Sequence, residues 1–252
     1  MSDELDILKA RCLELAKKSH GSGIYLFTDF LGLSEQSALR EIGPQLQGYI
    51  CTEFGGVEGA ERVMVRFGDP DQIPYDVPFP IQTLLIAPIA PKFAEKLSHR
   101  DYLGALMNLG IERGKLGDIV QREGGAYLFT REEIADYIRN NLTRVRHTDV
   151  KVTLVNGVPA GDIYTTERRR IVLSGERVDA VIAKVYNLSR EESAKLFVRG
   201  LVFVNGKEIS SPSHKPREND KISVRGYGRF IYVGTESTTK RGRLGVAVDV
   251  YV

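Results

Sequence analysis

The sequence predicts an α+β protein built from several small units rather than from one large domain. Helical and strand-like patterns alternate over residues 4–155, and a stretch with four prolines, "GDPDQIPYDVPFP", interrupts them. A compact helix–helix–hairpin pattern then fills the last third. We therefore expect two small N-terminal α/β units, the second plait-like, and a C-terminal unit with a β extension. The expected boundaries are 1–76, 77–160, a linker at 161–176, and 177–252.

The first unit opens with a helix, since apolar side chains recur at helical spacing over residues 4–19. "GIYLFTDFLG" and "RVMVRFGD" predict strands. "SEQSALREI" between them predicts a helix, and Ser34 is placed to cap it.

The second unit alternates strands and helices in the manner of a small α/β sandwich. Thr130 and Glu133 have the spacing of a capping box and should open its second helix. The expected elements are the strand "IQTLLIAPI", the helix "HRDYLGALMNLG" ending at Gly110, the strand "GAYLFT", the helix "REEIADYIRNNL" and the strand "VKVTLV".

The third unit begins with a short helix that has one apolar stripe. Ser189 and Glu192 predict the capping box of a second helix, which Gly200 should end in a left-handed conformation. Asn205-Gly206 then predicts a tight hairpin. The residues expected inside are Val178, Val181, Ile182 and Val185 from the first helix and Ala194, Phe197 and Val198 from the second.

Charge is distributed unevenly along the chain. Residues 165–245 hold 17 Lys and Arg against 9 Asp and Glu, a net +8, whereas the remainder holds 18 against 24, a net −6. A basic unit beside an acidic body is typical of proteins that bind polyanions, although a solvated basic face has the same composition.

The other totals favour an ordinary cytosolic protein. The amphipathic start has no apolar region of a signal peptide, and no apolar run approaches the ~20 residues that span a bilayer. Cys12 and Cys51 form no CxxC pattern and are expected to be buried and reduced.

Several motifs of the third unit, in order and spacing, resemble the S-four RNA-binding domain, named after ribosomal protein S-four. Ser193 stands where that family usually has alanine. The resemblance implies that Arg177 and Arg190 face RNA, while Asp179 orients the helix start. The motifs are "RVD" at 177–179, "SR" at 189–190, Gly200, "VFVNG" at 202–206, Pro212 and Asp220.

Further cations could extend this RNA-binding face. Helix, hairpin and strand positions suggest five of them, and Tyr227 could stack on a base. The run at 168–170 lies in the expected linker, where solvation is the more common role. The five are Lys195, Arg199, Lys207, Arg225 and Arg229.

A wider likeness covers most of the chain. "HRDYLGALMNLGIERGKLGDI", "EEIADYIRNNLT" and "RGYGRF" resemble the bacterial YlmH-type family. That resemblance implies binding to ribosomal RNA or tRNA, with the large ribosomal subunit as partner. Some relatives act in the rescue of large subunits obstructed by peptidyl-tRNA, and others are linked to cell division or photosystem upkeep.

Catalysis is not expected, and neither a metal nor a cofactor is implied. S-four domains often accompany RNA-modifying enzymes, but the chain has no "GRLD"-like segment of a pseudouridine synthase outside the S-four pattern. It also has no glycine loop of a methyltransferase after its first strand. A protein-interaction scaffold with secondary RNA binding stays open as an alternative, with protein partners unknown.

Overall fold

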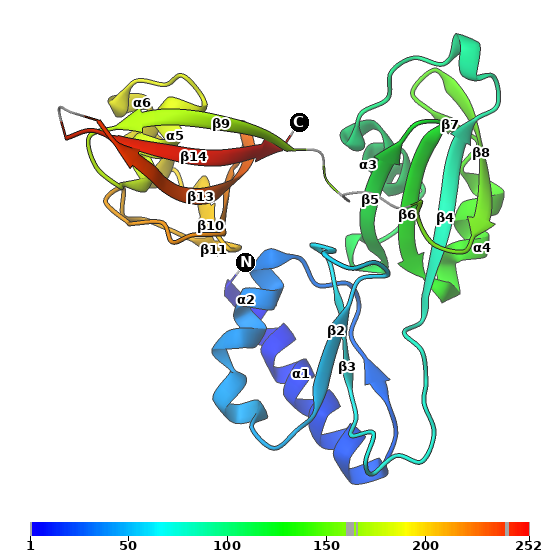
Figure 1. Ribbon diagram of the computed structural model, residues 1–252. Helices are drawn as coiled ribbons and strands as arrows, with labels where there is room; N and C mark the ends of the chain where they lie inside the picture. Colours follow the sequence, from blue (N-terminus) through cyan, green and yellow to red (C-terminus); the bar gives the residue numbers. More distant parts are fainter. Residues whose placement is uncertain (1, 160–163, 165, 240–241, 252) are drawn as a thin grey trace. The chain divides into compact units, whose positions relative to one another are not determined.

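The computed structural model describes residues 2–159, 164, 166–239 and 242–251, and it divides into two compact units, 1–163 and 164–252 (Figure 1). The first unit contains both of the expected N-terminal parts. Among the described residues, no helix has both the length and the apolar character that a membrane span requires.

The N-terminal part is a three-stranded antiparallel sheet, β1-β3-β2, on which two helices pack. Its core includes Cys12 and Phe67, whereas Cys51, which was expected to be buried, is exposed because β2 is exposed along its length. The predicted strand at 23–32 shortens to two residues, and Gly32 rather than Ser34 precedes the second helix, with Glu35 accepting from the Gly32 amide. The elements are α1 (Ser2–Ser22), β1 (Leu26–Phe27), α2 (Leu33–Glu41), a 3-10 helix (Gly43–Leu46), β2 (Cys51–Phe54) and β3 (Met64–Phe67).

The middle part is a plait, as predicted. Its sheet has the order β5-β6-β4-β8-β7, with α3 between the first two strands in sequence and α4 after the third, so the βαββαβ pattern is complete. The elements are β4 (Ile81–Pro88), a 3-10 helix (Pro91–Phe93), α3 (His99–Asn108), a 3-10 helix (Arg113–Lys115), β5 (Leu116–Arg122), β6 (Gly125–Arg131), α4 (Glu132–Asn141), β7 (Arg144–Val145) and β8 (Thr148–Val155).

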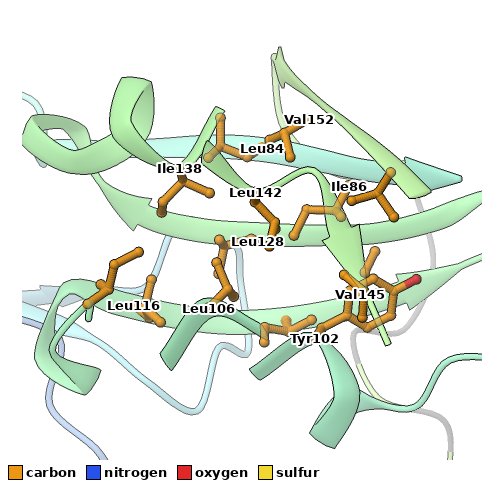
Figure 2. Close-up of a cluster of buried hydrophobic side chains, with 14 of the residues drawn as sticks. Leu84, Ile86, Tyr102, Leu106, Leu116, Leu128, Ile138, Leu142, Val145 and Val152 are labelled. Atoms are coloured by element: carbon orange, nitrogen blue, oxygen red, sulfur yellow. The ribbon is translucent and has the colours of Figure 1, made fainter. Parts of the chain in front are cut away.

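Both plait helices pack on one face of this sheet. Leu106 of α3 and Ile138 of α4 are fully buried against strand residues such as Leu84 and Leu128 (Figure 2). The alternation of strand side chains explains this, because every second residue points to the helical face.

The predicted capping box at Thr130 is wrong. Thr130 lies in β6, where its hydroxyl donates to the Lys115 carbonyl at 3.2 Å, and Arg131 precedes α4 instead. Glu133 pairs with Lys115 at 2.9 Å and with Arg131 at 3.3 Å. Thr130 is therefore a strand residue, although the local sequence pattern predicted that it would cap α4.

The N-terminal part packs on the plait face opposite the helices. Phe30 and Met64 share a buried cluster with Val120 and Phe129 of the plait. Gly117 allows this contact, because a Cβ there would lie 2.8 Å from the Phe30 ring and 2.9 Å from Phe129 Cβ.

The second unit is a six-stranded antiparallel sheet, β11-β10-β12-β13-β14-β9, with two helices that share its core. The expected linker is partly wrong, since residues 166–173 form β9, which pairs along its length with β14. The elements are β9 (Thr166–Leu173), α5 (Val178–Val185), α6 (Arg190–Val198), β10 (Val202–Val204), β11 (Lys207–Glu208), β12 (Asp220–Val224), β13 (Gly228–Thr238) and β14 (Leu244–Tyr251).

The predicted α5 stripe is confirmed, since all four of its residues are buried. The α6 stripe is partly wrong. Phe197 is buried as expected and Ala194 is half-buried, but Val198 is 90% exposed, and Ser193 and Leu196 complete the buried side. Positions 193, 196 and 197 follow the spacing of one helix face, from which position 198 is rotated away.

Candidate RNA interface

Two helix starts position the cations that resemble the S-four motif. At α6, the Glu192 amide donates to Ser189 Oγ at 3.2 Å and the Ser189 amide donates to Glu192 Oε2 at 2.8 Å, which confirms the capping box. Hydrogen bonds to its carboxylate from the Ser189 amide and, next, from the Ser189 hydroxyl lower the pKa of Glu192. The next residue, Arg190, is therefore held at the first position of the helix.

The start of α5 is closed by backbone groups. The Val178 amide donates to the His214 carbonyl at 2.9 Å, and the Asp179 amide donates to the Pro212 carbonyl at 3.3 Å. Since these amides are occupied, an anion at this helix start would have to be bound by side chains, of which Arg177 is the nearest.

Arg177 is exposed and held in one orientation. Its Nε and Nη2 donate to the two carboxylate oxygens of Asp179 at 3.0 and 2.9 Å, and this pairing raises the pKa of Arg177. Asp179 Oδ1 also accepts from the Ala180 amide at 2.9 Å. Asp179 thus orients both the helix start and the guanidinium, which keeps further N–H donors for a phosphate.

Arg190 borders a hollow of about 480 Å³ between α5 and β9. Its Nη2 lies 3.3 Å from Ser174 Oγ at the end of β9. Lys184 and Arg243 also line the hollow, and all three cations are exposed. We call this site the α5–β9 hollow, with the polar lining Ser174, Lys184, Asn187, Arg190 and Arg243.

The hollow brings together cations that the sequence prediction did not include. Lys184 lies on the side of α5 opposite the buried stripe, with the small residues Ala180 and Ala183, and that spacing was a usable signal. Arg243 has no comparable signal, because it reaches the hollow only through the pairing of Leu244 with Leu173.

Three predicted cations lie along the hairpin side of the domain. Arg199 ends α6, and Lys207 begins β11 after the left-handed Asn205-Gly206 turn. The Arg225 amide donates to the Leu201 carbonyl, and its guanidinium lies 4.4 Å from the centre of the Phe203 ring. Their contact with RNA stays a prediction.

Two further candidates are placed less favourably. Lys195 pairs with Glu191 at 2.7 Å along α6. Arg229 alternates with the buried Phe230 on β13 and lies over the Tyr251 ring at 5.1 Å, so it points away from the core and from the helices. An RNA contact by Arg229 would need a separate surface.

The arginine run at 168–170 is paired within β9 and its neighbours. Arg168 Nη2 donates to Asp249 at 3.0 Å, Arg169 pairs with Glu167 at 2.6 Å, and Arg170 pairs with Glu236 at 2.9 Å. These charges are already neutralised, which distinguishes them from the cations of the hollow.

The site offers hydrogen-bond donors and positive charge, which suit the phosphates of RNA. Within the described ranges, no three His, Cys, Asp or Glu side chains lie together as a metal site would require.

Comparison with known proteins identifies two domains of the chain. A family model described as a putative RNA-binding domain in YlmH matches residues 74–158, and the S4 domain model matches residues 176–222. The chain is 33% identical over 226 residues to Ribosome-associated protein quality control protein P2 of Bacillus subtilis, and the match covers 88% of this chain and 86% of that protein.

Two other similarities are more limited. An uncharacterized RNA pseudouridine synthase of Aquifex aeolicus is 44% identical over 48 residues, which are 19% of this chain and 15% of that protein. Cell division protein ylmH from Streptococcus pneumoniae is 24% identical with a TM-score of 0.48, covering 60% of this chain and 91% of that one. The long Bacillus match and the two matched domains in series show that the chain belongs to the YlmH family.

Proposed function

We propose that this chain is a non-catalytic RNA-binding protein that acts on the ribosome in the cytoplasm. The observation that carries the proposal is the α5–β9 hollow, where Lys184 and Arg190 of the S-four domain and Arg243 of the strands that follow it gather. The similarity to a protein named for ribosome-associated quality control, which extends over most of both chains, supports a role on the ribosome.

The partner we propose is the large ribosomal subunit, and the task is the rescue of stalled subunits that carry peptidyl-tRNA. The exposed cations of the S-four domain would hold the backbone of structured rRNA or tRNA, with Arg177 fixed by Asp179 and Arg190 fixed by Ser174. Orientation before binding lowers the entropy that the complex must lose.

An RNA-modifying enzyme is less well supported. The similarity to the pseudouridine synthase is confined to 15% of that protein, which leaves most of it without a counterpart here. RNA binding without catalysis is sufficient to explain the exposed cations.

Co-sedimentation with purified ribosomal subunits tests the proposal. The wild type should sediment with the large subunit, and the variant Arg177→Ala/Arg190→Ala should lose most of this association. The control Arg168→Ala/Arg169→Ala removes the same charge from β9, outside the residues that match the S4 domain, and should behave as the wild type. Circular dichroism establishes that each variant is folded.

If the folded double variant associates with the large subunit as the wild type does, the binding surface lies outside the S-four domain. Sedimentation with the small subunit alone would refute the proposed partner. Turnover of RNA by the purified protein would refute the non-catalytic assignment.

A further inference from the structure

The plait has a basic pocket of its own, on its helical side. A pocket of about 530 Å³ opens between α3, the end of α4 and β7. We call it the α3–β7 pocket. Its polar lining includes Arg100, Asn108, Asn141, Thr143, Arg144 and Arg146.

Arginines outnumber acids in the lining of this pocket. Three arginines line it with one acid, Asp101, which is already engaged, and two further acids lie beyond the lining, with Asp149 3.6 Å from Arg144 and Glu95 3.8 Å from Arg146. Asp101 Oδ2 accepts from the Ser98 amide at 2.8 Å and from the Ser98 hydroxyl at 2.7 Å, and these bonds lower its pKa. Arg146 is 3.7 Å from the other oxygen. The structure shows no acidic partner for Arg100 among the residues it describes.

The backbone at Arg146 indicates that the position of this side chain matters. Arg146 has φ +52°, in the left-handed region that residues with a side chain rarely adopt. It sits in the two-residue turn between β7 and β8, where glycine or asparagine would be relaxed. An arginine kept at such a position is often functional.

The opposite face of the plait is partly closed. RNA-binding domains of plait shape commonly stack bases on their open sheet. Here the N-terminal part buries Val120 and Phe129 on that sheet, so these positions cannot stack a base. Among the described residues of this unit, none from the N-terminal part lines the pocket on the helical side.

An exposed aromatic ring lies two residues before Glu95, an acid that contacts the rim of the pocket, and the ring itself is outside the lining. Phe93, after β4, is 90% exposed. Two residues later, Glu95 Oε1 accepts from the His147 amide at 3.0 Å, and Glu95 Oε2 lies 3.8 Å from Arg146 Nε. The segment with Phe93 is thereby attached to the rim that carries Arg146. Cations beside an exposed ring are the combination that binds unpaired RNA.

We infer that the α3–β7 pocket is a second RNA site, separate from the S-four face, that binds an unpaired segment. Arg100, Arg144 and Arg146 hold its phosphates, and Phe93 stacks on one base. This inference rests on the proposed function, since it extends RNA binding from the S-four domain to the plait.

Binding of fluorescein-labelled oligouridylate, which forms no duplex, tests the pocket in the full-length protein. The variant Arg100→Gln/Arg144→Gln/Arg146→Gln should bind roughly tenfold more weakly, and its salt slope should fall by about 2. Phe93→Ala should weaken the binding of oligouridylate at least about fivefold and should weaken the binding of an RNA duplex much less. The matched control Lys17→Gln/Lys18→Gln/Lys151→Gln makes the same change in net charge at exposed positions outside the pocket and should bind as the wild type.

Equal binding by the pocket variant and the control would overturn the inference. Loss of ribosome association with unchanged oligouridylate binding would show that the pocket contacts something other than unpaired RNA and would also overturn the inference. If the triple variant does not fold, Arg100→Glu alone, at an exposed helix position, gives the same test.

The two proposals fail separately in these experiments. The Arg177→Ala/Arg190→Ala variant on ribosomal subunits reports on the proposed function. The pocket variant on oligouridylate reports on the plait, whatever the subunits show.

Discussion

Removing the three cations of the α5–β9 hollow should change how RNA binding depends on salt. The variant is Lys184→Gln/Arg190→Gln/Arg243→Gln, which leaves the buried core of the domain untouched. Each phosphate contact contributes about 0.7 to 0.9 to the slope of log affinity against log salt. Three lost contacts should therefore lower the slope by about 2 to 3. Between roughly 50 and 200 mM salt, the wild type should lose about 15- to 60-fold more affinity than the variant.

Fluorescence anisotropy with a labelled stem-loop of large-subunit RNA measures these slopes. The control Arg168→Gln/Arg169→Gln/Arg170→Gln removes the same number of charges from the same domain, but from residues paired with Asp249, Glu167 and Glu236. Its slope should stay close to that of the wild type, because internally neutralised cations release few counterions. Equal slopes for the two variants would refute the assignment of the hollow, since only net charge would then matter.

Two further predictions concern the first unit. Gly117→Val should destabilise it by about 1–3 kcal/mol in urea unfolding, because the new side chain would overlap Phe30 and Phe129, whereas Gly104→Ala, with open space around it, should not destabilise. An unchanged unfolding midpoint for Gly117→Val would contradict the packing described. Burial raises the pKa of the Cys12 thiol from 9.0 to about 11, so stability from this group is complete below about pH 9 and is lost as pH rises toward 11. In urea unfolding at a series of pH values, the free energy of unfolding of Cys12→Ala should fall less steeply above pH 9 than that of the wild type. An equally steep fall in the variant would refute this prediction.

The local signals of the S-four domain were predictable from sequence. The apolar stripe of α5, the capping box at Ser189 and the left-handed turn at Asn205-Gly206 each depend on residues a few positions apart. Such interactions form within one helix or one hairpin, so the neighbouring sequence specifies them.

The failures involve partners that are distant in sequence. Thr130 was predicted to cap a helix, but pairing with β4 and β5 keeps it in a strand. Residues 166–173 have a linker-like composition and become a strand because β14, some 80 positions later, pairs with them. Arg243 reaches the α5–β9 hollow through the same pairing, which no local pattern reports.

The most direct test of RNA binding by the S-four domain is cross-linking from the hollow itself. A photo-reactive amino acid would replace Lys184 in the full-length protein, and the RNA cross-linked in cells would be sequenced. The same amino acid at Arg170, which pairs with Glu236 and is not part of the hollow's lining, serves as the control. We expect Lys184 to recover large-subunit rRNA or tRNA at defined positions and Arg170 to recover far less. Equal recovery at both positions, or no RNA from Lys184, would contradict it.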